Sequence, residues 1–397
     1  MCAEFAVHGV VPGRVAAPGT VEETAAVMAA AHAAGAVVVP WGGGTQQLIG
    51  GPPERVDLVV RTGRLNRVLI HEPDDLTISV EGGMTLGELR RYLAPHGQML
   101  PINPPLADTA TIGGLLATAM DGPRRLGYGT MRDLLIGIGV VDVGGRVSKA
   151  GGMVVKNVSG FDMMKLYHGS YGTLALITSA NFKLLPVPRA MAALLCRFAT
   201  RDDAFNMLDA LHASQLTPSA AEYLNSAALR QIGAEGTHAV YVLAEGLPQA
   251  VKRHVDNLAL MARAHGGQIE NVGGDSTLDE RITDLPQTLG VAPDAAVVKI
   301  VTLPAELAAA LATLEALAEQ PAITARALDG VAYARLAATN AEQLHRLAAR
   351  QPGLQWIATP IAGAPRWGAL PEGAAMMRRI KAEFDPQEHL NRGRFAV

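Results

Sequence analysis

Glycine is distributed very unevenly along this chain, and the distribution limits the folds open to it. Of the 42 glycines, 28 fall in residues 1–190 and 14 in residues 191–397. Glycine tolerates left-handed backbone angles and lets backbone approach another group closely, so it gathers in tight turns and binding loops. We therefore expect a turn-rich N-terminal half and a C-terminal half built from more regular helices and strands.

Composition excludes several classes of protein. A length of 397 residues indicates two or three domains, at roughly 100–200 residues each. A net charge of −3 and the lack of basic runs give no indication of a basic surface that would bind nucleic acid. No stretch reaches the ~20 apolar residues of a membrane span. The start of the chain lacks a basic region followed by an apolar one, so we expect a cytoplasmic protein.

Cysteine and histidine provide no metal-binding pattern. Cys2 and Cys196 are the only cysteines, whereas an iron–sulfur cluster takes about four. The 11 histidines include no His-x-His or His-x-x-x-His pair. We expect no metal site in this chain.

Residues 1–187 are expected to alternate short strands with glycine-rich turns. A helix is predicted over 20–34, because Thr20 is a good N-cap and acidic residues occupy the first turn. The apolar run at 36–40 predicts a short buried strand. Further strands are predicted at 57–61, 66–71 and 76–81, and a helix over 85–94.

Residues 188–360 follow a different pattern. Predicted strands at 190–199, 220–224, 237–245 and 268–272, with helices over 201–213 and 248–264, give the order β-α-β-β-α-β of a ferredoxin-like sheet. A similar series follows, with strands at 295–303, 322–328, 331–336 and 354–359 and helices over 304–319 and 341–350. We expect an antiparallel sheet with helices on one side. The last segment, 361–397, contains a predicted helix over 372–384.

The first candidate binding motif is the loop at residues 40–46, Pro-Trp-Gly-Gly-Gly-Thr-Gln. Three consecutive glycines after a buried strand let successive N–H groups turn to one side, which makes a nest for anions such as phosphate. A plain loop is an equally good interpretation of these residues alone. A P-loop is excluded, because no Gly-Lys-Ser/Thr follows at the required spacing.

The second motif covers residues 104–114, after which small residues continue through 122 and a Tyr-Gly-Thr sequence follows at 128–130. Its small side chains suit a flat ligand lying close to backbone, although these residues alone favour a tightly packed helix crossing. The third motif covers 155–162 and 165–178. The fourth covers 385–394. An exposed tail does not need such a motif, so we expect this segment to pack against the rest of the protein.

In this order, the four motifs resemble the FAD-linked oxidases with a PCMH-type (vanillyl-alcohol-oxidase-like) FAD domain. The likeness covers about residues 15–187 and the last ~15 residues, and within the family it is greatest to the FAD-binding subunit of bacterial glycolate oxidase. The resemblance implies an α+β chain: a PCMH-type FAD-binding domain of two α/β subdomains (1–187), an antiparallel ferredoxin-like cap domain (188–360), and a C-terminal segment (361–397) returning to the FAD domain.

The resemblance also implies which residues contact the cofactor. The glycine loop would hold the pyrophosphate, residues 111–118 would follow the diphosphate, ribityl chain and flavin, Gly172 and Ile177 would lie near adenine, and Asn391 would return towards the flavin. The implied FAD-binding residues are Pro40, Trp41, Gly42, Gly43, Gly44, Thr45, Gln46, Pro105, Asp108, Thr111, Ile112, Gly113, Gly114, Thr118, Gly122, Tyr128, Gly129, Gly172, Ile177 and Asn391.

Departures from the family pattern refine the expectation. Some members attach FAD through a histidine in the pyrophosphate loop, but this loop has no histidine or cysteine, so we expect noncovalent FAD. The hydroxyacid dehydrogenases carry a His-x-Gly-Asp-Gly-Asn-x-His type cluster, which is missing here. Tyr171 stands where the family usually has Glu, and Phe161 where it has Tyr. No residue is a convincing general base, so we name no catalytic residue.

The resemblance implies an FAD-binding subunit of a glycolate (2-hydroxyacid) oxidase complex that oxidises glycolate to glyoxylate. Its partners would be a catalytic flavoprotein subunit and an iron–sulfur subunit, with contact to the inner membrane face only through them. Two alternatives stay open: a self-contained FAD-dependent oxidoreductase acting on another alcohol or hydroxyacid, and a scaffold that keeps the fold without the flavin.

Overall fold

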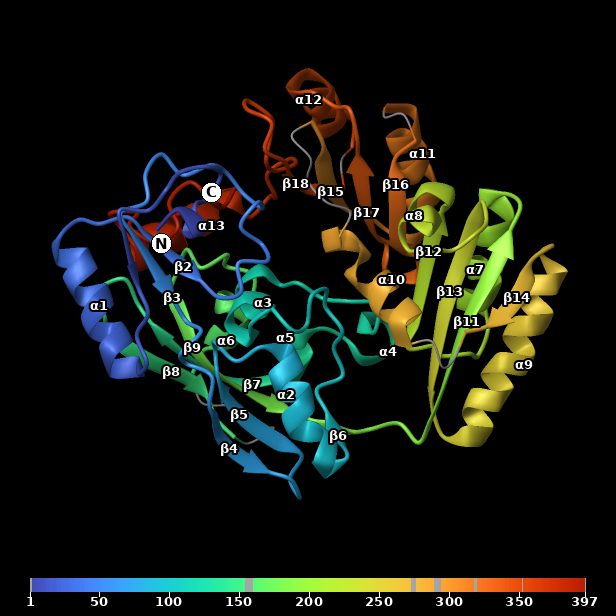
Figure 1. The fold of residues 1–397 in the computed structure, drawn as a ribbon, viewed down its shortest axis with the longest axis horizontal. Helices are drawn as coiled ribbons and strands as arrows, with labels where there is room; N and C mark the ends of the chain where they lie inside the picture. The colour runs from blue at the N-terminus through green and yellow to red at the C-terminus, as the bar shows by residue number, and fades with distance from the viewer. Residues whose placement is uncertain are drawn as a thin grey trace.

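The computed structural model describes residues 2–153, 160–272, 276–288, 294–317, 320–351 and 353–396. The N-terminal half contains two sheets. A three-stranded parallel sheet has the order β1-β3-β2, and helix α1 lies beside it (Figure 1). The bounds are β1 Arg14–Ala16, α1 Val21–Ala33, β2 Val38–Trp41 and β3 Leu58–Arg61. As predicted, Thr20 caps α1, accepting a hydrogen bond from the Glu23 N–H at 3.1 Å.

The second sheet is antiparallel, with the order β4-β5-β9-β7-β8. Helix α3 packs on its β9 strand, and residues of α1, β2, β7 and β9 share a core between the two sheets. The strand bounds are β4 Val68–Glu72, β5 Thr77–Glu81, β7 Leu135–Val141, β8 Val147–Gly151 and β9 Leu176–Lys183. The helices are α2 Leu86–Leu93, α3 Ile112–Thr118, α4 Arg125–Tyr128, α5 Met131–Leu134 and α6 Met163–Tyr167, and the short strands β6 Gln98–Met99 and β10 Leu185–Pro186 pair with each other.

The C-terminal half forms one eight-stranded sheet, in the order β14-β11-β13-β12-β16-β17-β15-β18. It consists of two four-stranded units joined edge to edge, because β12 pairs with β16. The first unit is β11 Ala190–Phe198, β12 Ala220–Asn225, β13 His238–Gly246 and β14 Gln268–Asn271, with α7 Arg201–Ala213, α8 Ser226–Gln231 and α9 Pro248–Ala264. The second is β15 Ala296–Val301, β16 Ala322–Arg326, β17 Val331–Leu336 and β18 Leu354–Ala358, with α11 Leu307–Leu317 and α12 Ala341–Arg350.

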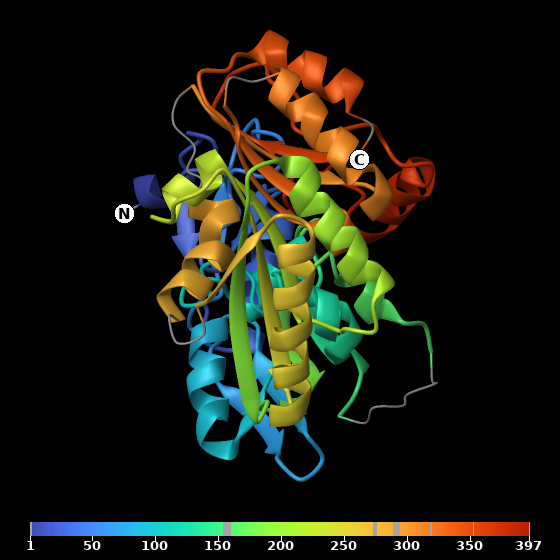
Figure 2. The ribbon, with the colours of Figure 1, turned by 90° about the vertical axis from the view of Figure 1, so that its right-hand side faces the viewer.

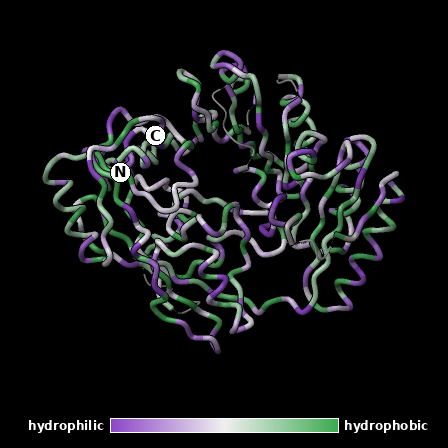
Figure 3. The backbone as a smooth tube through the Cα atoms, in the orientation of Figure 1, coloured by the Kyte–Doolittle hydropathy of each residue, from purple (hydrophilic) through white to green (hydrophobic). Residues whose placement is uncertain are grey.

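The two faces of this sheet have different neighbours. Helices α7, α9, α11 and α12 lie on the face turned away from the N-terminal half (Figures 1 and 2). In Figure 3 hydrophobic and hydrophilic stretches alternate along α9, which buries Val251, Leu258 and Ala262. The opposite face contributes Tyr241, Tyr333 and other residues to the core that it shares with the N-terminal half. The α+β class is therefore confirmed.

Helix α10 (Ser276–Thr288) was not predicted from the sequence. It contains Pro286, whose ring and missing N–H disfavour a helix interior. It lies between the eight-stranded sheet and the N-terminal half (Figure 1), where the buried Ile282 and Leu285 join the shared core. Tertiary packing thus stabilises a helix that local propensity alone does not favour.

The C-terminal segment returns to the first sheet. After helix α13 (Ala374–Phe384), Leu390 forms a parallel bridge with Val38 of β2. The Val38 N–H donates to the His389 carbonyl at 2.7 Å, and the Asn391 N–H donates to the Val38 carbonyl at 2.9 Å. Figure 1 shows this red segment beside the blue N-terminal strands. Domain division at 187 and 360 stays a prediction.

No helix among the described residues is both long and apolar enough to cross a membrane.

Candidate functional site

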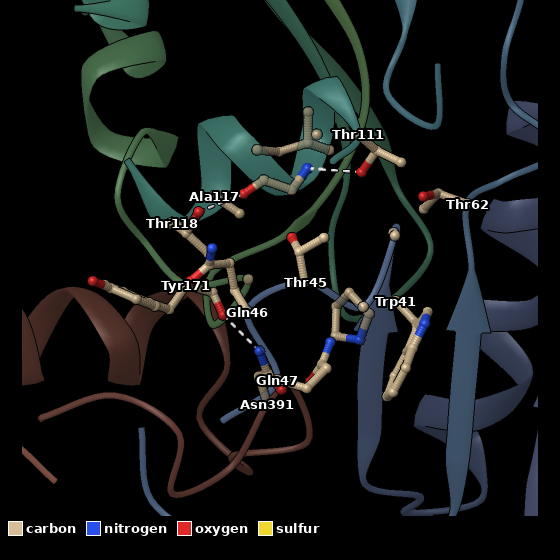
Figure 4. A pocket seen from close by; sticks show the side chains of 18 of the residues that line it. Trp41, Thr45, Gln46, Gln47, Thr62, Thr111, Ala117, Thr118, Tyr171 and Asn391 are labelled. Atoms are coloured by element: carbon tan, nitrogen blue, oxygen red, sulfur yellow. Dashed lines mark hydrogen bonds between the residues drawn. The ribbon is translucent and has the colours of Figure 1, made fainter. Parts of the chain in front are cut away.

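A pocket opens where β2, the loop after it, α3 and the C-terminal segment meet. Figure 4 shows Thr111 and Thr118 of α3 facing Thr45 and Gln46 of the loop. The described lining residues are Pro40, Trp41, Gly42, Gly43, Gly44, Thr45, Gln46, Gln47, Ile49, Thr62, Thr111, Gly113, Gly114, Ala117, Thr118, Tyr171, Gly172, Ala175, Leu176, Ile177, Asn391 and Arg394.

The glycine loop contributes hydrogen-bond donors to this pocket. Among the residues that the structure describes, no acceptor receives a hydrogen bond from the N–H groups of residues 43–46. Gly44 has a φ of +74°, a left-handed value that reverses the direction of the chain at this point. Consecutive backbone amides without a protein acceptor form a nest suited to an anionic oxygen. The loop is therefore chemically fitted to hold a pyrophosphate.

Close packing leaves no room for a Cβ at the first two glycines of the loop unless their neighbours shift. A Cβ placed on Gly42 would lie 2.1 Å from Thr111 Oγ1, and one on Gly43 would lie 1.8 Å from the Thr109 carbonyl oxygen. Thr111 also caps α3, because its Oγ1 accepts a hydrogen bond from the Gly114 N–H at 3.3 Å. The loop thus rests directly on the chain that begins α3, and glycine is required for this approach.

Two buried amide oxygens on the pocket lining have no protein donor among the described residues. They are Gln46 Oε1 and Asn391 Oδ1. Asn391 is oriented by its own Nδ2, which donates to the Tyr171 carbonyl at 2.6 Å. A buried acceptor without a donor costs free energy. Both oxygens are thus available to hydroxyl or N–H donors of a ligand, which FAD carries on its ribityl chain and ring.

Arg394 adds positive charge to the pocket lining. Its Nη1 donates to the Gly51 carbonyl at 3.0 Å and its Nη2 to the Gln47 carbonyl at 2.7 Å. No carboxylate among the described residues pairs with it. Burial, with Arg366 nearby, lowers the pKa of Arg394 to about 10. The guanidinium remains charged at neutral pH and favours an anionic group beside it.

Comparisons with known proteins show what two regions of the chain resemble. Residues 12–161 match the model described as the FAD binding domain, and residues 366–395 match the one described as the C-terminal domain of FAD linked oxidases. The two matches meet in space at this pocket, because Trp41 and Asn391 both line it. In these two regions the chain is thus similar to FAD-linked oxidases. The resemblance inferred from the four sequence motifs, and FAD as the cofactor, are confirmed.

Named relatives cover only part of the molecule. The D-lactate dehydrogenase of Archaeoglobus fulgidus is 32% identical over 232 residues, which is 58% of this chain and 52% of that protein. The glycolate oxidase subunit GlcE of Escherichia coli is 36% identical over 151 residues, 38% of this chain and 43% of that protein. The chain thus spans about half the length of these relatives.

The likeness to solved structures extends over nearly the whole chain. The structure of p-cresol methylhydroxylase with substrate bound matches with a TM-score of 0.72 at 15% identity, covering 97% of this chain and 89% of that one. At this identity the likeness shows the fold alone. It confirms that the chain has the PCMH-type fold expected from its sequence.

Most of the residues expected to bind FAD line the pocket. Those that do are Pro40, Trp41, Gly42, Gly43, Gly44, Thr45, Gln46, Thr111, Gly113, Gly114, Thr118, Gly172, Ile177 and Asn391. Sequence reasoning missed Gln47, Ile49, Thr62, Ala117, Tyr171, Ala175, Leu176 and Arg394. Tyr171, Ala175, Leu176 and Arg394 lie inside the third and fourth motifs, so their position in a motif could have identified them. Thr62 lies outside the motifs, and its sequence position gave no indication of a place in the pocket. Cofactor contact by each residue remains a proposal.

Six expected residues lie outside the pocket lining: Pro105, Asp108, Ile112, Gly122, Tyr128 and Gly129. Ile112 is fully buried in the hydrophobic core, as its position in the first turn of α3 dictates. Asp108 lines a separate polar cavity and pairs with Arg91 at 2.7 Å. The pocket therefore does not support a cofactor role for these six residues.

Three more of the six, Gly122, Tyr128 and Gly129, belong to the stretch after α3 that reaches the eight-stranded sheet through α4. Gly122 packs against the Asn103 carbonyl, and Gly127, next to Tyr128, donates its N–H to the Ser219 carbonyl at 3.2 Å. In the third motif, residues 155–159 lie outside the described residues. Among the described residues, no group of three metal-ligating side chains could hold an ion.

A buried ion pair fixes the C-terminal segment that presents Asn391. The Asp385 carboxylate accepts hydrogen bonds from the His389 and Leu390 N–H groups at 2.9 and 2.7 Å. It also pairs with Lys381 at 2.5 Å, and Lys381 in turn donates to the Thr173 carbonyl at 2.8 Å. This network joins α13 and the C-terminal turn to the loop that precedes β9.

Asp385→Asn is expected to loosen this segment. The amide keeps one acceptor but loses the charge, and a hydrogen bond to a charged group contributes about 1.5–3 kcal/mol. We expect a loss of about 2 kcal/mol in unfolding free energy and about tenfold weaker FAD binding, measured by urea unfolding and FAD titration. The control Glu388→Gln removes an exposed pair with Arg392 and should change neither; equal effects of the two variants would contradict this role.

A second buried charge cluster connects the eight-stranded sheet to the chain after α3. Arg326 of β16 pairs through Nη1 with Asp121 Oδ1 and donates through Nη2 to the Asp121 carbonyl at 2.8 Å. Glu222 of β12 lies 3.8 Å from Arg326 Nε. Burial raises the pKa of Glu222 to about 8, against the opposing effect of Arg326. Burial also acts to raise the pKa of Asp121, but Arg326 and Lys299 outweigh it and lower the pKa.

Glu222 is expected to make stability depend on pH. An unfolded glutamate loses its proton near its ordinary pKa of 4.5, whereas folded Glu222 keeps it to about 8. Between these values the folded state binds more protons, so unfolding free energy falls as pH rises, by at most about 1.4 kcal/mol per pH unit. In urea unfolding from pH 5 to 8, Glu222→Gln should remove most of this decline. An unchanged pH dependence in the variant would show that Glu222 is not its source.

Proposed function

We propose that this chain is an FAD-binding subunit of a 2-hydroxyacid oxidase complex, with glycolate as the substrate that the complex converts to glyoxylate. The observation that carries the proposal is the glycine loop: the N–H groups of residues 43–46 have no acceptor among the described residues, and these residues line a pocket that the C-terminal segment completes. The similarity to a glycolate oxidase subunit over 151 residues supports the choice of complex.

Bound FAD would supply two-electron redox chemistry. The amides of residues 43–46 would hold its pyrophosphate, Gln46 and Asn391 would accept hydrogen bonds from its donors, and Arg394 would place a positive charge beside it. No histidine or cysteine is present among the described residues of the pocket lining. We therefore expect noncovalent binding, so that acid precipitation releases all of the FAD into the supernatant.

The pocket lining lacks a base for substrate oxidation. Of the described lining residues, only Tyr171 and Arg394 titrate, and burial raises the pKa of the Tyr171 phenol well above its usual range. Both therefore stay protonated at neutral pH, and neither can remove a proton from a hydroxyacid. Substrate oxidation is assigned to a partner flavoprotein subunit, and electron transfer to an iron–sulfur partner.

Purified alone, the chain is expected to bind FAD without catalysing glycolate-dependent reduction of an artificial dye. Co-expression with a flavoprotein and an iron–sulfur partner should restore turnover, and loss of FAD from this chain should then lower it. Turnover by the isolated, FAD-loaded chain would contradict the subunit assignment and favour a self-contained oxidoreductase.

A further inference from the structure

Three basic side chains from distant parts of the sequence lie close together beside the loop that follows the glycine nest. His8 belongs to the N-terminal segment, Arg366 to the segment after β18, and Arg394 to the C-terminal segment. His8 forms a hydrogen bond with the Gly50 backbone, and Arg394 Nη1 donates to the carbonyl of Gly51 at 3.0 Å. His8 and Arg394 therefore contact neighbouring residues of this loop.

The aromatic residues that follow the two arginines bring Arg366 to the same place. The rings of Trp367 and Phe395 are in edge-to-face contact, with centres 5.2 Å apart. Because each ring comes directly after one of the arginines, the backbones of Arg366 and Arg394 are held near each other. The charge of Arg366 also acts on His8 and Arg394 and lowers the pKa of each. We call His8, Arg366 and Arg394 the basic cluster.

Three nitrogen atoms of the basic cluster are buried without a hydrogen-bond partner among the described residues: His8 Nε2, Arg366 Nε and Arg394 Nε. The η nitrogens of Arg366 donate instead to the Thr359 and Ile361 carbonyls, as those of Arg394 donate to the loop. Both guanidinium groups are thus held in place while their Nε–H groups stay unused. A buried donor without an acceptor costs free energy, so both Nε–H groups are available to an acceptor that a ligand brings.

The basic cluster has no negative charge to balance it in the part of the chain that the structure describes. Arg326 pairs with the Asp121 carboxylate, but Arg366 and Arg394 have no such pair there. Burial lowers the pKa of both, and no carboxylate acts in the opposite direction. Buried charge without a partner is unfavourable. An anion at the cluster would supply both the missing charge and the missing acceptors.

We propose that His8, Arg366 and Arg394 form a binding site for one phosphate group. Two fixed positive charges and donors from separate segments suit this group, because it carries negative charge and several acceptor oxygens. Arg394 lines the FAD pocket, whereas His8 and Arg366 are not part of its lining. The phosphate is therefore either one of the two in FAD or a free phosphate that binds beside the cofactor. The site does not depend on the chain being a subunit of a hydroxyacid oxidase.

Calorimetric titration of inorganic phosphate, at an ionic strength held constant with chloride, tests the site in the FAD-loaded and the FAD-free chain. Saturable binding to both forms identifies a free phosphate. Saturable binding to the FAD-free chain alone identifies a phosphate of FAD, and inorganic phosphate then competes with FAD but not with riboflavin. Absence of saturable binding to either form would overturn the proposal. A chain that takes up no FAD refutes the proposed function, and titration of the FAD-free chain still tests the cluster.

A matched pair of arginine variants locates the bound phosphate. Arg366→Met removes one charge and one unused donor from the basic cluster and should weaken phosphate binding at least about tenfold. Arg263→Met, on an exposed position of α9, should leave it unchanged. Equal binding by the two variants would overturn the proposal, because the phosphate would then bind elsewhere, as at the amides of residues 43–46.

A second measurement needs no loss of an arginine and applies if Arg366→Met unfolds. The pKa of His8 is lowered to about 4 by burial and by the charges of Arg394 and Arg366. A bound anion offsets these charges, so saturating sulfate, a tetrahedral anion like phosphate, should raise this pKa to about 5 or higher in an NMR titration. His8→Asn, which suits the φ of +48° at this position, assigns the signal. The same pKa in sulfate and in chloride would overturn the proposal.

Discussion

Replacing Gly43 by alanine is expected to abolish useful FAD binding. The new Cβ would lie 1.8 Å from the Thr109 carbonyl oxygen, a backbone atom that cannot rotate away. The loop must shift to relieve the overlap, which would move the amides of residues 43–46 away from their places in the pocket lining. Overpacking of this kind costs about 1–3 kcal/mol. If a cost near the upper value, about 3 kcal/mol, is taken from the FAD-binding free energy, FAD binds roughly a hundredfold more weakly.

Fluorescence titration of FAD into the apoprotein measures this effect. The matched control is Gly63→Ala, because a Cβ at Gly63 meets nothing within 4 Å and Gly63 has no left-handed φ. Circular dichroism and the thermal midpoint establish that both variants fold. Wild-type affinity in Gly43→Ala would show that the loop does not hold the cofactor.

Arg326→Met is expected to lower the unfolding free energy by about 3 kcal/mol. The Asp121 and Arg326 side chains are 7% and 2% exposed, so removal of the arginine leaves a buried carboxylate with Arg125 as its remaining partner at 2.7 Å. Breaking a buried pair in this way costs about 3–5 kcal/mol. Because Arg125 still pairs with Asp121, we expect a loss at the lower end of this range.

Urea unfolding distinguishes this effect from the loss of an ordinary surface charge. Arg197→Met removes an exposed pair with Glu270 and should cost at most about 1 kcal/mol. The double variant Arg326→Met/Asp121→Asn should recover part of the loss, because a neutral amide then replaces the buried Asp121 carboxylate. Equal, small effects of the two arginine variants would contradict a role for the buried pair in joining the halves of the molecule.

Features that depend on local sequence were well predicted. Thr20 caps a helix that begins at the next residue, because capping depends on hydrogen bonds between residues three apart. The ferredoxin-like units were evident from the spacing of apolar runs. The glycine loop lines the pocket as expected, since a strand followed by three glycines constrains the backbone whatever surrounds it.

Features that depend on distant contacts were not predicted. Thr62 reaches the pocket from a segment outside the four motifs, and no spacing in the sequence relates it to them. Tyr128 was placed near FAD by motif order, yet the chain after α3 turns towards β12. The Asp121–Arg326 pair joins residues 205 positions apart, so only the folded chain brings its charges together.

A titration of the apoprotein with FAD and with riboflavin tests the central claim most directly. If the amides of residues 43–46 hold a pyrophosphate, one FAD binds per chain, and riboflavin, which lacks the pyrophosphate, binds at least about a hundredfold more weakly. Equal affinity for the two flavins, or no FAD binding at all, would contradict the account.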